Sequence, residues 1–221
     1  MDTQRTSTLI EPLEGPLTGS IRVPGDKSIS HRAVLFAAMA EGTSRLSGLL
    51  DSDDVRSSIR AVEQLGARVS LEKMADASLA GGITGWGKGG PRTPDAAVDC
   101  GNSGTTARLL MGILASWDIE AELTGDDSLR RRPMRRVTAP LARMGARFYP
   151  EDAATLPLTV RGTRFPHAID YDSPVASAQV KTAILLAGVR AQGTTRVFEP
   201  SPSRNHTELM LPRFGVQTTA A

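Results

Sequence analysis

Two cations and a hydroxyl group come together in the segment Pro24-Gly-Asp-Lys-Ser-Ile-Ser-His-Arg32. Lys27, Ser28 and Arg32 lie within about one turn of the start of an apolar segment that is expected to be helical. Free N–H groups and the helix dipole attract anions at such an end, so these side chains would complete a phosphate site. An alternative of equal weight is that Ser28 or Ser30 caps the helix and the cations are solvated.

The same arrangement recurs at two later places in the chain. Asp99-Cys-Gly-Asn-Ser-Gly-Thr-Thr-Ala-Arg108 and Ser173-Pro-Val-Ala-Ser-Ala-Gln179 each lead into another apolar helical segment. Asn102 and Ser103 can cap the second helix, and Gly104 lets the backbone approach a ligand closely. Three equivalent helix N-termini with small polar residues predict one shared anion-binding face.

Five arginines fall within the eight residues Leu129–Arg136. Three interpretations are open: a solvated basic face, a nucleic-acid site, or one arginine that forks onto a carboxylate or phosphate. No aromatic residues interleave for base stacking, which disfavours nucleic acid. Arg132 is the candidate for the fork, because Pro133 after it suits the first position of a helix.

Nucleotide binding is disfavoured despite two glycine patterns. The segment Gly85–Gly90 fits G-x-G-x-x-G, and Gly82–Lys88 fits G-x-x-x-x-G-K. Both patterns require a following helix, but Pro91 and Pro94 follow here. A turn between strands is expected instead.

No metal or disulfide is expected. His31, His167 and His206 lack metal-ligand spacing, and His206 is expected to open a helix. Cys100 is the only cysteine, so no disulfide can form within the chain. No histidine lies near Cys100 in the sequence, and it is expected to be a small buried residue. A lone thiol suits a reducing cytoplasm.

Composition indicates an ordinary soluble globular protein. The 221 residues are 40% hydrophobic and 23% charged, which excludes disorder. A net charge of +2 is too small to indicate nucleic acid but suits small anionic ligands. The longest apolar runs, such as 33–40, reach about eight residues, whereas a membrane helix needs about 20. Neither a membrane span nor a targeting leader is expected.

Three segments share one plan that would position these candidates: an apolar helix, a strand, an amphipathic helix ending at glycine, and a further strand. The apolar helices are expected within 30–43, 105–116 and 180–194, and the amphipathic helices within 54–69, 132–148 and 204–216. Left-handed caps are expected at Gly66, Gly145 and Gly215. Strands are expected near 20–23, 44–49, 67–72, 95–99, 119–124, 146–149, 157–161 and 194–198.

This pattern predicts an α/β domain of three similar units, with helices in the centre and sheets outside. In the third unit only a few residues follow Gly215, whereas the first two units continue into further strands. The pattern therefore predicts a fragment or one part of a split protein.

Five motifs together resemble the 5-enolpyruvylshikimate-3-phosphate (EPSP) synthase family, over about residues 10 to 216: VPGDKSISHRA, DCGNSGTTARLLMG, LTGDDSLRRRPM, SAQVKTAILLAG and EPSPSRNHTELML. The RNHTE and SAQVK segments are most similar to the bacterial class noted for glyphosate tolerance. The enolpyruvyl transferases of cell-wall synthesis share the fold but use other motifs.

The resemblance implies a fold of two similar domains, each an inside-out α/β barrel of three βαββαβ-type units. Residues 19–221 would be the N-terminal substrate-binding domain with its third unit truncated, and residues 1–18 would pack with a C-terminal domain. The implied reaction joins the 5-hydroxyl of shikimate-3-phosphate to C2 of phosphoenolpyruvate and releases phosphate, in aromatic amino-acid biosynthesis. No metal or organic cofactor is implied, and the full enzyme is expected to be a cytoplasmic monomer.

The resemblance also implies site residues. Those for shikimate-3-phosphate are Lys27, Ser28, Arg32, Ser177, Ala178, Gln179 and Arg204. Those for phosphoenolpyruvate are Lys27, Asn102, Gly104, Thr105, Arg132 and Gln179. Lys27 would also be catalytic, since it reaches both ligands and can stabilise charge or move a proton.

The carboxylates for the remaining proton transfers lie in the C-terminal domain of the family, so this chain is expected to be inactive alone. Glyphosate is the expected inhibitor, and tolerance is in question because tolerant members often have alanine where this chain has Gly104. The alternatives are a stand-alone module that binds anions or phosphometabolites without catalysis and, more remotely, a nucleic-acid binder through residues 130–136.

Overall fold

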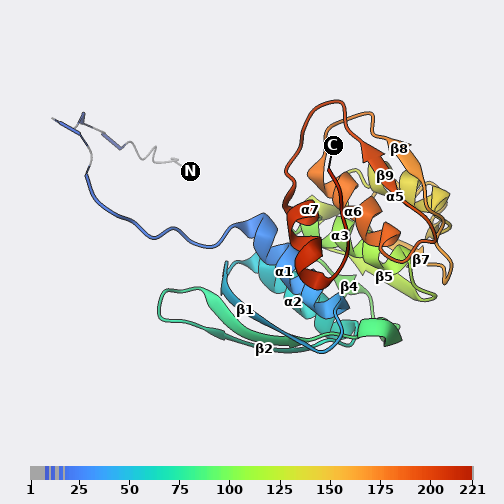
Figure 1. The fold of residues 1–221 in the computed structure, drawn as a ribbon, viewed down its shortest axis with the longest axis horizontal. Helices are drawn as coiled ribbons and strands as arrows, with labels where there is room; N and C mark the ends of the chain where they lie inside the picture. The colour runs from blue at the N-terminus through green and yellow to red at the C-terminus, as the bar shows by residue number, and fades with distance from the viewer. Residues whose placement is uncertain (1–7, 10, 13–14, 17, 221) are drawn as a thin grey trace, which may run out of the picture.

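A computed structural model describes residues 8–9, 11–12, 15–16 and 18–220 of the chain. Three helices form its centre and are buried on nearly all sides (Figure 1). They are α1 (Lys27–Met39), α3 (Gly104–Ala115) and α6 (Ala178–Gly188). Because their apolar residues cover the whole circumference, each helix requires neighbours on every side. The sheets and the remaining helices supply those neighbours.

The first unit continues from α1 into a three-stranded antiparallel sheet of order β1-β3-β2, which lies below the helices in Figure 1. Its elements are β1 (Thr43–Leu49), α2 (Asp53–Gln64), β2 (Arg68–Lys73) and β3 (Leu79–Thr84). Val69 pairs with Ile83 in the register of β2 and β3. The short 3-10 helix η1 (Gly87–Gly89) follows β3. Among the described residues, the α-helix that a nucleotide-binding glycine pattern requires at this place does not form, as expected.

The second unit builds a four-stranded sheet of order β4-β5-β7-β6, in which only β4 and β5 are parallel. Its strands and helices are β4 (Val98–Asp99), β5 (Glu120–Thr124), α4 (Asp127–Arg130), α5 (Arg135–Arg143), β6 (Arg147–Tyr149) and β7 (Leu158–Arg161). Ala121 and Leu123 alternate with exposed glutamates along β5, so one face of this sheet lies on the core.

The third unit has a sheet of two parallel strands. Its elements are β8 (Asp170–Asp172), β9 (Arg196–Phe198), α7 (His206–Met210) and the 3-10 helix η2 (Leu211–Phe214). Each of the second and third units therefore begins with a strand that pairs in parallel with the strand after the buried helix. The predicted α/β fold of three units with buried helices is confirmed, whereas a closed barrel stays a prediction.

The predicted glycine caps are also confirmed. Gly66, Gly145 and Gly215 have φ values of 103°, 104° and 80°, in the left-handed region that residues with a Cβ rarely adopt. Gly112 serves a different purpose, because a Cβ there would collide with the backbone of Ala183. α3 and α6 can therefore cross closely at this glycine.

Some sequence predictions about strands were wrong. Residues 20–23 form no strand: Ile21 and Val23 are 88% and 71% exposed, and the part of the chain described places no strand beside them. β3 and β8 were not predicted, because β3 contains Gly81 and Gly82 and β8 has the largely acidic sequence Asp-Tyr-Asp. Both strands owe their existence to pairing with neighbours rather than to their own propensity. Most of the predicted segment 1–18 lies outside the described residues.

The start of the arginine-rich helix was also predicted wrongly. α5 begins at Arg135, not at Pro133, because the N–H of Met134 donates to the carbonyl of Ala154 at 2.7 Å and holds the chain outside the helix. The short helix α4 comes before it, and the Asp126 carboxylate caps α4 by accepting from the N–H of Leu129 at 2.7 Å.

The caps of the buried helices lie partly where the sequence places them. Of the two caps expected for α3, Asn102 and Ser103, the structure has Ser103, and Ser177 caps α6. Asp26 caps α1 by accepting from the N–H of Ile29 at 2.8 Å, so the cap at Ser28 or Ser30 was wrong. No helix among the described residues is long and apolar enough to cross a membrane.

Candidate anion-binding site

The N-termini of α1, α3 and α6 are joined by side-chain hydrogen bonds. Arg32 of α1 donates from Nη2 to Thr182 Oγ1 of α6 at 2.8 Å. Gln179 of α6 donates from Nε2 to Thr105 Oγ1 of α3 at 2.9 Å. The three helix ends that the sequence singled out therefore lie together, and their free N–H groups share one region.

The first group of residues surrounds Arg32, which is only 2% exposed. Its Nε donates to Thr207 Oγ1 at 2.8 Å, and its Nη1 donates to the carbonyl oxygen of Ser28 at 2.9 Å. Burial lowers the pKa of Arg32, while the charges of Glu208 and Asp26 act in the opposite direction. We call Arg32, Thr207, Lys181, Glu199 and Glu208 the Arg32 cluster.

Lys27 and Ser28 lie at the rim beside this cluster. The Lys27 ammonium forms an ion pair with Asp54 of α2, and its side chain is 52% exposed. Ser28 Oγ accepts from Arg204 Nη1 at 3.1 Å, so the first and last predicted motifs meet although the sequence separates them widely. Asp54 is a neighbour of Lys27 that sequence reasoning missed.

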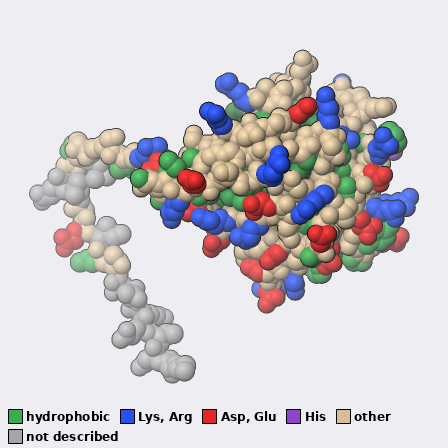
Figure 2. Space-filling model, turned by 90° about the horizontal axis from the view of Figure 1, so that it is seen from below, with side chains coloured by type: hydrophobic (Ala, Val, Ile, Leu, Met, Phe, Trp, Pro, Cys, Tyr) green, Lys and Arg blue, Asp and Glu red, His purple; other side chains and the backbone are tan. Residues whose placement is uncertain are grey.

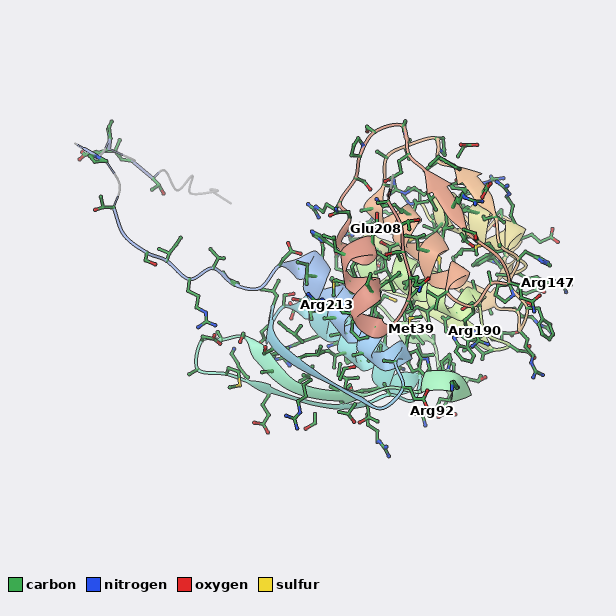
Figure 3. All side chains as sticks on the ribbon, in the orientation of Figure 1. Met39, Arg92, Arg147, Arg190, Glu208 and Arg213 are labelled. Carbon is green, nitrogen blue, oxygen red and sulfur yellow. The ribbon has the colours of Figure 1, made fainter. Side chains whose placement is uncertain are left out.

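Inside the Arg32 cluster, Lys181 lies between two carboxylates. Its Nζ is 2.8 Å from Glu199 Oε2 and 2.7 Å from Glu208 Oε1. Burial alone would lower the pKa of Lys181, but the hydrogen bonds to the two glutamates and their negative charges together outweigh burial and raise it. Glu208 is labelled on α7 in Figure 3.

The second group surrounds Arg108, which is 4% exposed. Its Nη1 donates to Gln179 Oε1 at 2.9 Å and its Nη2 donates to the carbonyl oxygen of Pro133 at 3.1 Å. Its buried Nε has no hydrogen-bond partner. Burial above all, and then the charges of Arg136 and Arg132, lower the pKa of Arg108 to about 10. We call Arg108, Gln179, Thr105, Arg132 and Asn102 the Arg108 cluster.

Arg132 joins this cluster through Asn102. Its Nη2 donates to Asn102 Oδ1, and Asn102 Nδ2 donates to Asp126 Oδ2 at 2.6 Å. Hydrogen bonds from the N–H of Leu129 and from Asn102 lower the pKa of Asp126. Asn102 therefore orients Arg132 without neutralising its charge.

Gly104 lies between the two guanidinium groups. A Cβ at this position would be 2.6 Å from Arg108 Nη1 and 3.3 Å from Arg132 Nη1. The sequence predicts that the backbone at Gly104 approaches a ligand closely. In the structure this backbone lies close to the guanidinium groups of Arg108 and Arg132. A small anion that binds to both guanidinium groups would also contact this backbone.

The predicted site residues therefore separate into two neighbouring groups. Ser177 caps α6 and Ala178 begins it, where the Ala178 carbonyl accepts from Thr182 Oγ1 at 2.6 Å. Sequence reasoning missed the residues that support these groups: Arg108, Lys181, Thr182, Glu199, Thr207 and Glu208. A usable signal existed for two of them, since Arg108 and Lys181 are lone cations inside otherwise apolar helices.

The remaining candidates have structural surroundings. Cys100 is fully buried, and burial followed by the charge of Asp99 raises its pKa to about 12, so it stays a thiol. The described residues contain no group of three or more acidic, histidine or cysteine side chains that could hold a metal. Cavities of about 460 and 380 Å³ lie elsewhere, one lined by residues of α5 and β6 and the other reaching Met39, at the far end of α1 (Figure 3).

Basic side chains do not form a single field on the face drawn in Figure 2. Lys and Arg interleave there with Asp and Glu. Duplex DNA binding relies on a continuous basic surface, and this face does not provide one.

Fold and site together describe an α/β domain of repeated units with buried arginines at helix N-termini. Residues 13–221 match the family model of EPSP synthase (3-phosphoshikimate 1-carboxyvinyltransferase). The chain belongs to this family.

Individual relatives agree with this assignment. The chain is 51% identical over 201 residues to the 3-phosphoshikimate 1-carboxyvinyltransferase of Xanthomonas euvesicatoria pv. vesicatoria, and 53% identical over 206 residues to that of Acidiphilium cryptum. These matches cover 91% and 93% of this chain but 45% of each relative. A solved EPSP synthase from Acinetobacter baumannii matches with a TM-score of 0.83 and 42% identity, covering 92% of this chain and 45% of that one. The chain thus spans under half the length of these relatives.

Proposed function

We propose that this chain is the substrate-binding half of an enzyme that transfers the enolpyruvyl group of phosphoenolpyruvate to the 5-hydroxyl of shikimate-3-phosphate. One observation carries the proposal: Arg108 is buried beside Gln179 and Arg132, and no carboxylate within the described residues contacts its guanidinium group. A buried charge of this kind requires an anionic partner. Both proposed substrates are anions.

The two clusters suggest how the substrates are divided. Shikimate-3-phosphate would bind beside the Arg32 cluster, through the side chains of Lys27, Ser28, Arg32 and Arg204 and the N-terminus of α6 at Ser177, Ala178 and Gln179. Phosphoenolpyruvate would bind at the Arg108 cluster, beside Asn102, Gly104, Thr105 and Arg132. Gln179 belongs to both places, because it lies at the start of α6 beside Ser177 and Ala178, and its amide contacts Arg108 and Thr105 of the Arg108 cluster.

The chemistry explains why so many cations are needed. Two phosphates and two carboxylates must approach one another before the 5-hydroxyl oxygen can bond to C2 of phosphoenolpyruvate. In that step the 5-hydroxyl gives up its proton and C3 takes up a proton. Phosphate then leaves C2 of the tetrahedral intermediate as C3 loses a proton, which restores the double bond. Lys27 is the proposed catalytic group, and its ion pair with Asp54 keeps the ammonium at the rim of the site.

The proposal includes the wider organisation of the enzyme. Residues 19–221 would form the N-terminal domain, and residues 1–18 would pack with a further domain that supplies the remaining acid–base groups. The complete enzyme would be a cytoplasmic monomer that glyphosate inhibits at the Arg108 cluster. The buried thiol of Cys100 suits a reducing compartment.

Calorimetry and a phosphate-release assay test this proposal. We expect the 221-residue chain to bind shikimate-3-phosphate, and to release no phosphate from the two substrates unless the C-terminal half of a relative is added. Turnover by the chain alone would overturn the division into halves. Binding without any turnover after the second half is added would favour a stand-alone anion-binding module instead.

A further inference from the structure

Lys181 is a buried cation for which the proposed chemistry has no direct use. It lies on α6 one turn after the cap residue Ser177, whose carbonyl accepts from the N–H of Lys181 at 3.0 Å. Its side chain is 11% exposed and contacts Glu199 at 2.8 Å and Glu208 at 2.7 Å. Three segments of the chain, α6, the residues after β9, and α7, therefore meet at one ammonium group.

Glu199 connects Lys181 to two parts of the proposed phosphate site. Its Oε1 accepts from the N–H of Ser177 at 2.9 Å, and its Oε2 accepts from Ser203 Oγ at 2.8 Å. Ser203 comes directly before Arg204, whose guanidinium reaches Ser28. The position of the Glu199 carboxylate thus sets both the start of α6 and the loop that carries Arg204.

Glu208 connects Lys181 to Arg32. It follows Thr207, whose Oγ1 accepts from Arg32 Nε at 2.8 Å and lies 2.6 Å from Thr182 Oγ1. The negative charge of Glu208 also stabilises the buried guanidinium of Arg32. If Glu208 moved, Arg32 would lose both the carboxylate charge that stabilises it most and the alignment of its hydrogen-bond acceptor Thr207.

The charges in this cluster balance only when Lys181 is present. Arg32 and Lys181 carry two positive charges, and Glu199 and Glu208 carry two negative charges, all in surroundings with little water. Without the ammonium group, the two carboxylates would repel each other across the space that it now fills. Each would move away from the residue that it holds.

We propose that Lys181 is a positioning residue for the phosphate of shikimate-3-phosphate, acting through Glu199 on Ser177 and Arg204 and through Glu208 on Arg32. The inference rests on the proposed function. Lys181 makes no contact with substrate in this role, which differs from the role of the residues that bind the shikimate ring or phosphoenolpyruvate.

Calorimetric titration of the 221-residue chain with shikimate-3-phosphate and with shikimate, which lacks the phosphate, tests the role. Lys181→Met should weaken binding of shikimate-3-phosphate about tenfold or more and leave shikimate binding within about twofold, because only the phosphate contacts are misplaced. Lys181→Arg should recover most of the affinity. Lys88→Met is the matched control, since Lys88 is 91% exposed and pairs with the exposed Glu41, and it should change neither ligand.

Each outcome decides a separate question. A folded Lys181→Met chain that binds shikimate-3-phosphate like the wild type overturns the inference, and so does an equal loss for both ligands, which indicates general disorder. If Lys181→Met does not fold, Glu208→Gln gives the decision: the same phosphate-dependent loss supports the role, and unchanged binding refutes it. A wild-type chain that binds no shikimate-3-phosphate defeats the proposed function instead.

Discussion

Arg32 and Arg108 are both buried arginines near the N-termini of central helices, yet their surroundings differ in charge. Arg32 has the carboxylates of Glu208 and Asp26 nearby, and these oppose the effects of burial and of the Arg204 charge on its pKa. Among the described residues, the charges that shift the pKa of Arg108 are those of Arg136 and Arg132, and both add to the effect of burial. The first arginine is balanced within the protein, and the second is not.

This difference indicates two ways of building an anion site. At the Arg32 cluster the counter-charges hold the cation in place before any ligand arrives, at the expense of part of its attraction for an anion. At the Arg108 cluster the full positive charge stays available, and the folded protein bears the cost of burying it. Such a conflict between stability and charge is expected at functional sites.

Removing a balancing charge should have the largest effect on stability. Lys181→Met leaves two carboxylates facing each other in a mostly buried space, and we expect the free energy of unfolding to fall by about 3–5 kcal/mol. Urea denaturation followed by circular dichroism measures the change. Lys88→Met should leave the midpoint where it is, and equal midpoints for both variants would show that the Arg32 cluster is not balanced by Lys181.

The buried His31 should make the free energy of unfolding depend on pH. Its Nδ1 lies 2.8 Å from Ser58 Oγ, and Ser58 continues through Thr106 to the cap Ser103 of α3. Burial lowers the pKa of His31 from 6.5 to about 4. Between pH 6.5 and about 4, His31 is therefore protonated in the unfolded chain and neutral in the folded chain. Stability should therefore fall by about 3 kcal/mol as the pH drops from above 6.5 to below 4.

Carboxylates also titrate in this pH range, so the effect of His31 is measured as the difference in stability between the wild type and a variant without this histidine. Unfolding free energies of the wild type and of His31→Gln are compared at each pH, with the exposed His167→Gln as control. The wild type should lose more stability with acid than His31→Gln does. Parallel curves would mean that protonating His31 costs nothing.

Arg132 and Arg130 should differ in a full-length enzyme that carries this sequence. Arg132 joins the Arg108 cluster through Asn102, whereas Arg130 donates to Thr124 Oγ1 at 3.1 Å outside it. A charge-assisted fork contributes about 1.5–3 kcal/mol, so Arg132→Lys should raise the KM for phosphoenolpyruvate about ten- to a hundredfold. Arg130→Lys should raise it less than about twofold. Equal effects of the two substitutions would favour the interpretation that all five arginines form a solvated basic face.

Gly104→Ala tests how closely the two guanidinium groups surround a ligand. The added methyl group would press on the ends of Arg108 and Arg132, which can yield at a cost of about 1–3 kcal/mol. Glyphosate is longer than phosphoenolpyruvate, so we expect its inhibition constant to rise more than the KM for phosphoenolpyruvate. Competition kinetics of the full-length enzyme measure both. A Gly104 enzyme that is already indifferent to millimolar glyphosate would show that this glycine does not set the response.

Of these substitutions, Arg108→Met should change the free energy of unfolding least. It therefore contrasts most clearly with Lys181→Met. The variant loses the charge-assisted hydrogen bonds to Gln179 and Pro133, each worth about 1.5–3 kcal/mol, but it also removes the cost of burying a charge without a carboxylate, which is of similar size. We expect the net change to stay within about 1 kcal/mol, while binding of phosphoenolpyruvate to the full-length enzyme is lost. A large loss of stability would reveal a counter-charge for Arg108.

Much of the fold was predictable from local patterns. The three buried helices follow from runs that are apolar on every face, and the caps at Gly66, Gly145 and Gly215 follow from one residue type at helix ends. β3 and β8 were not predictable, because glycine and aspartate disfavour strands and only the neighbouring strands stabilise them there. The start of α5 escaped prediction because a tertiary hydrogen bond to Ala154 decides it.

The sequence by itself determined which side chains could bind anions, since residue type and distance from a helix start are local properties. Lys27, Arg32, Gly104 and Arg132 are recognisable in this way. Only the tertiary structure decided which arginine has counter-charges. Glu208 comes to Arg32 from a helix near the other end of the chain, while no acidic residue comes to Arg108 within the described residues. Charge balance depends on distances across the fold, because Coulomb interactions act through space and not along the chain.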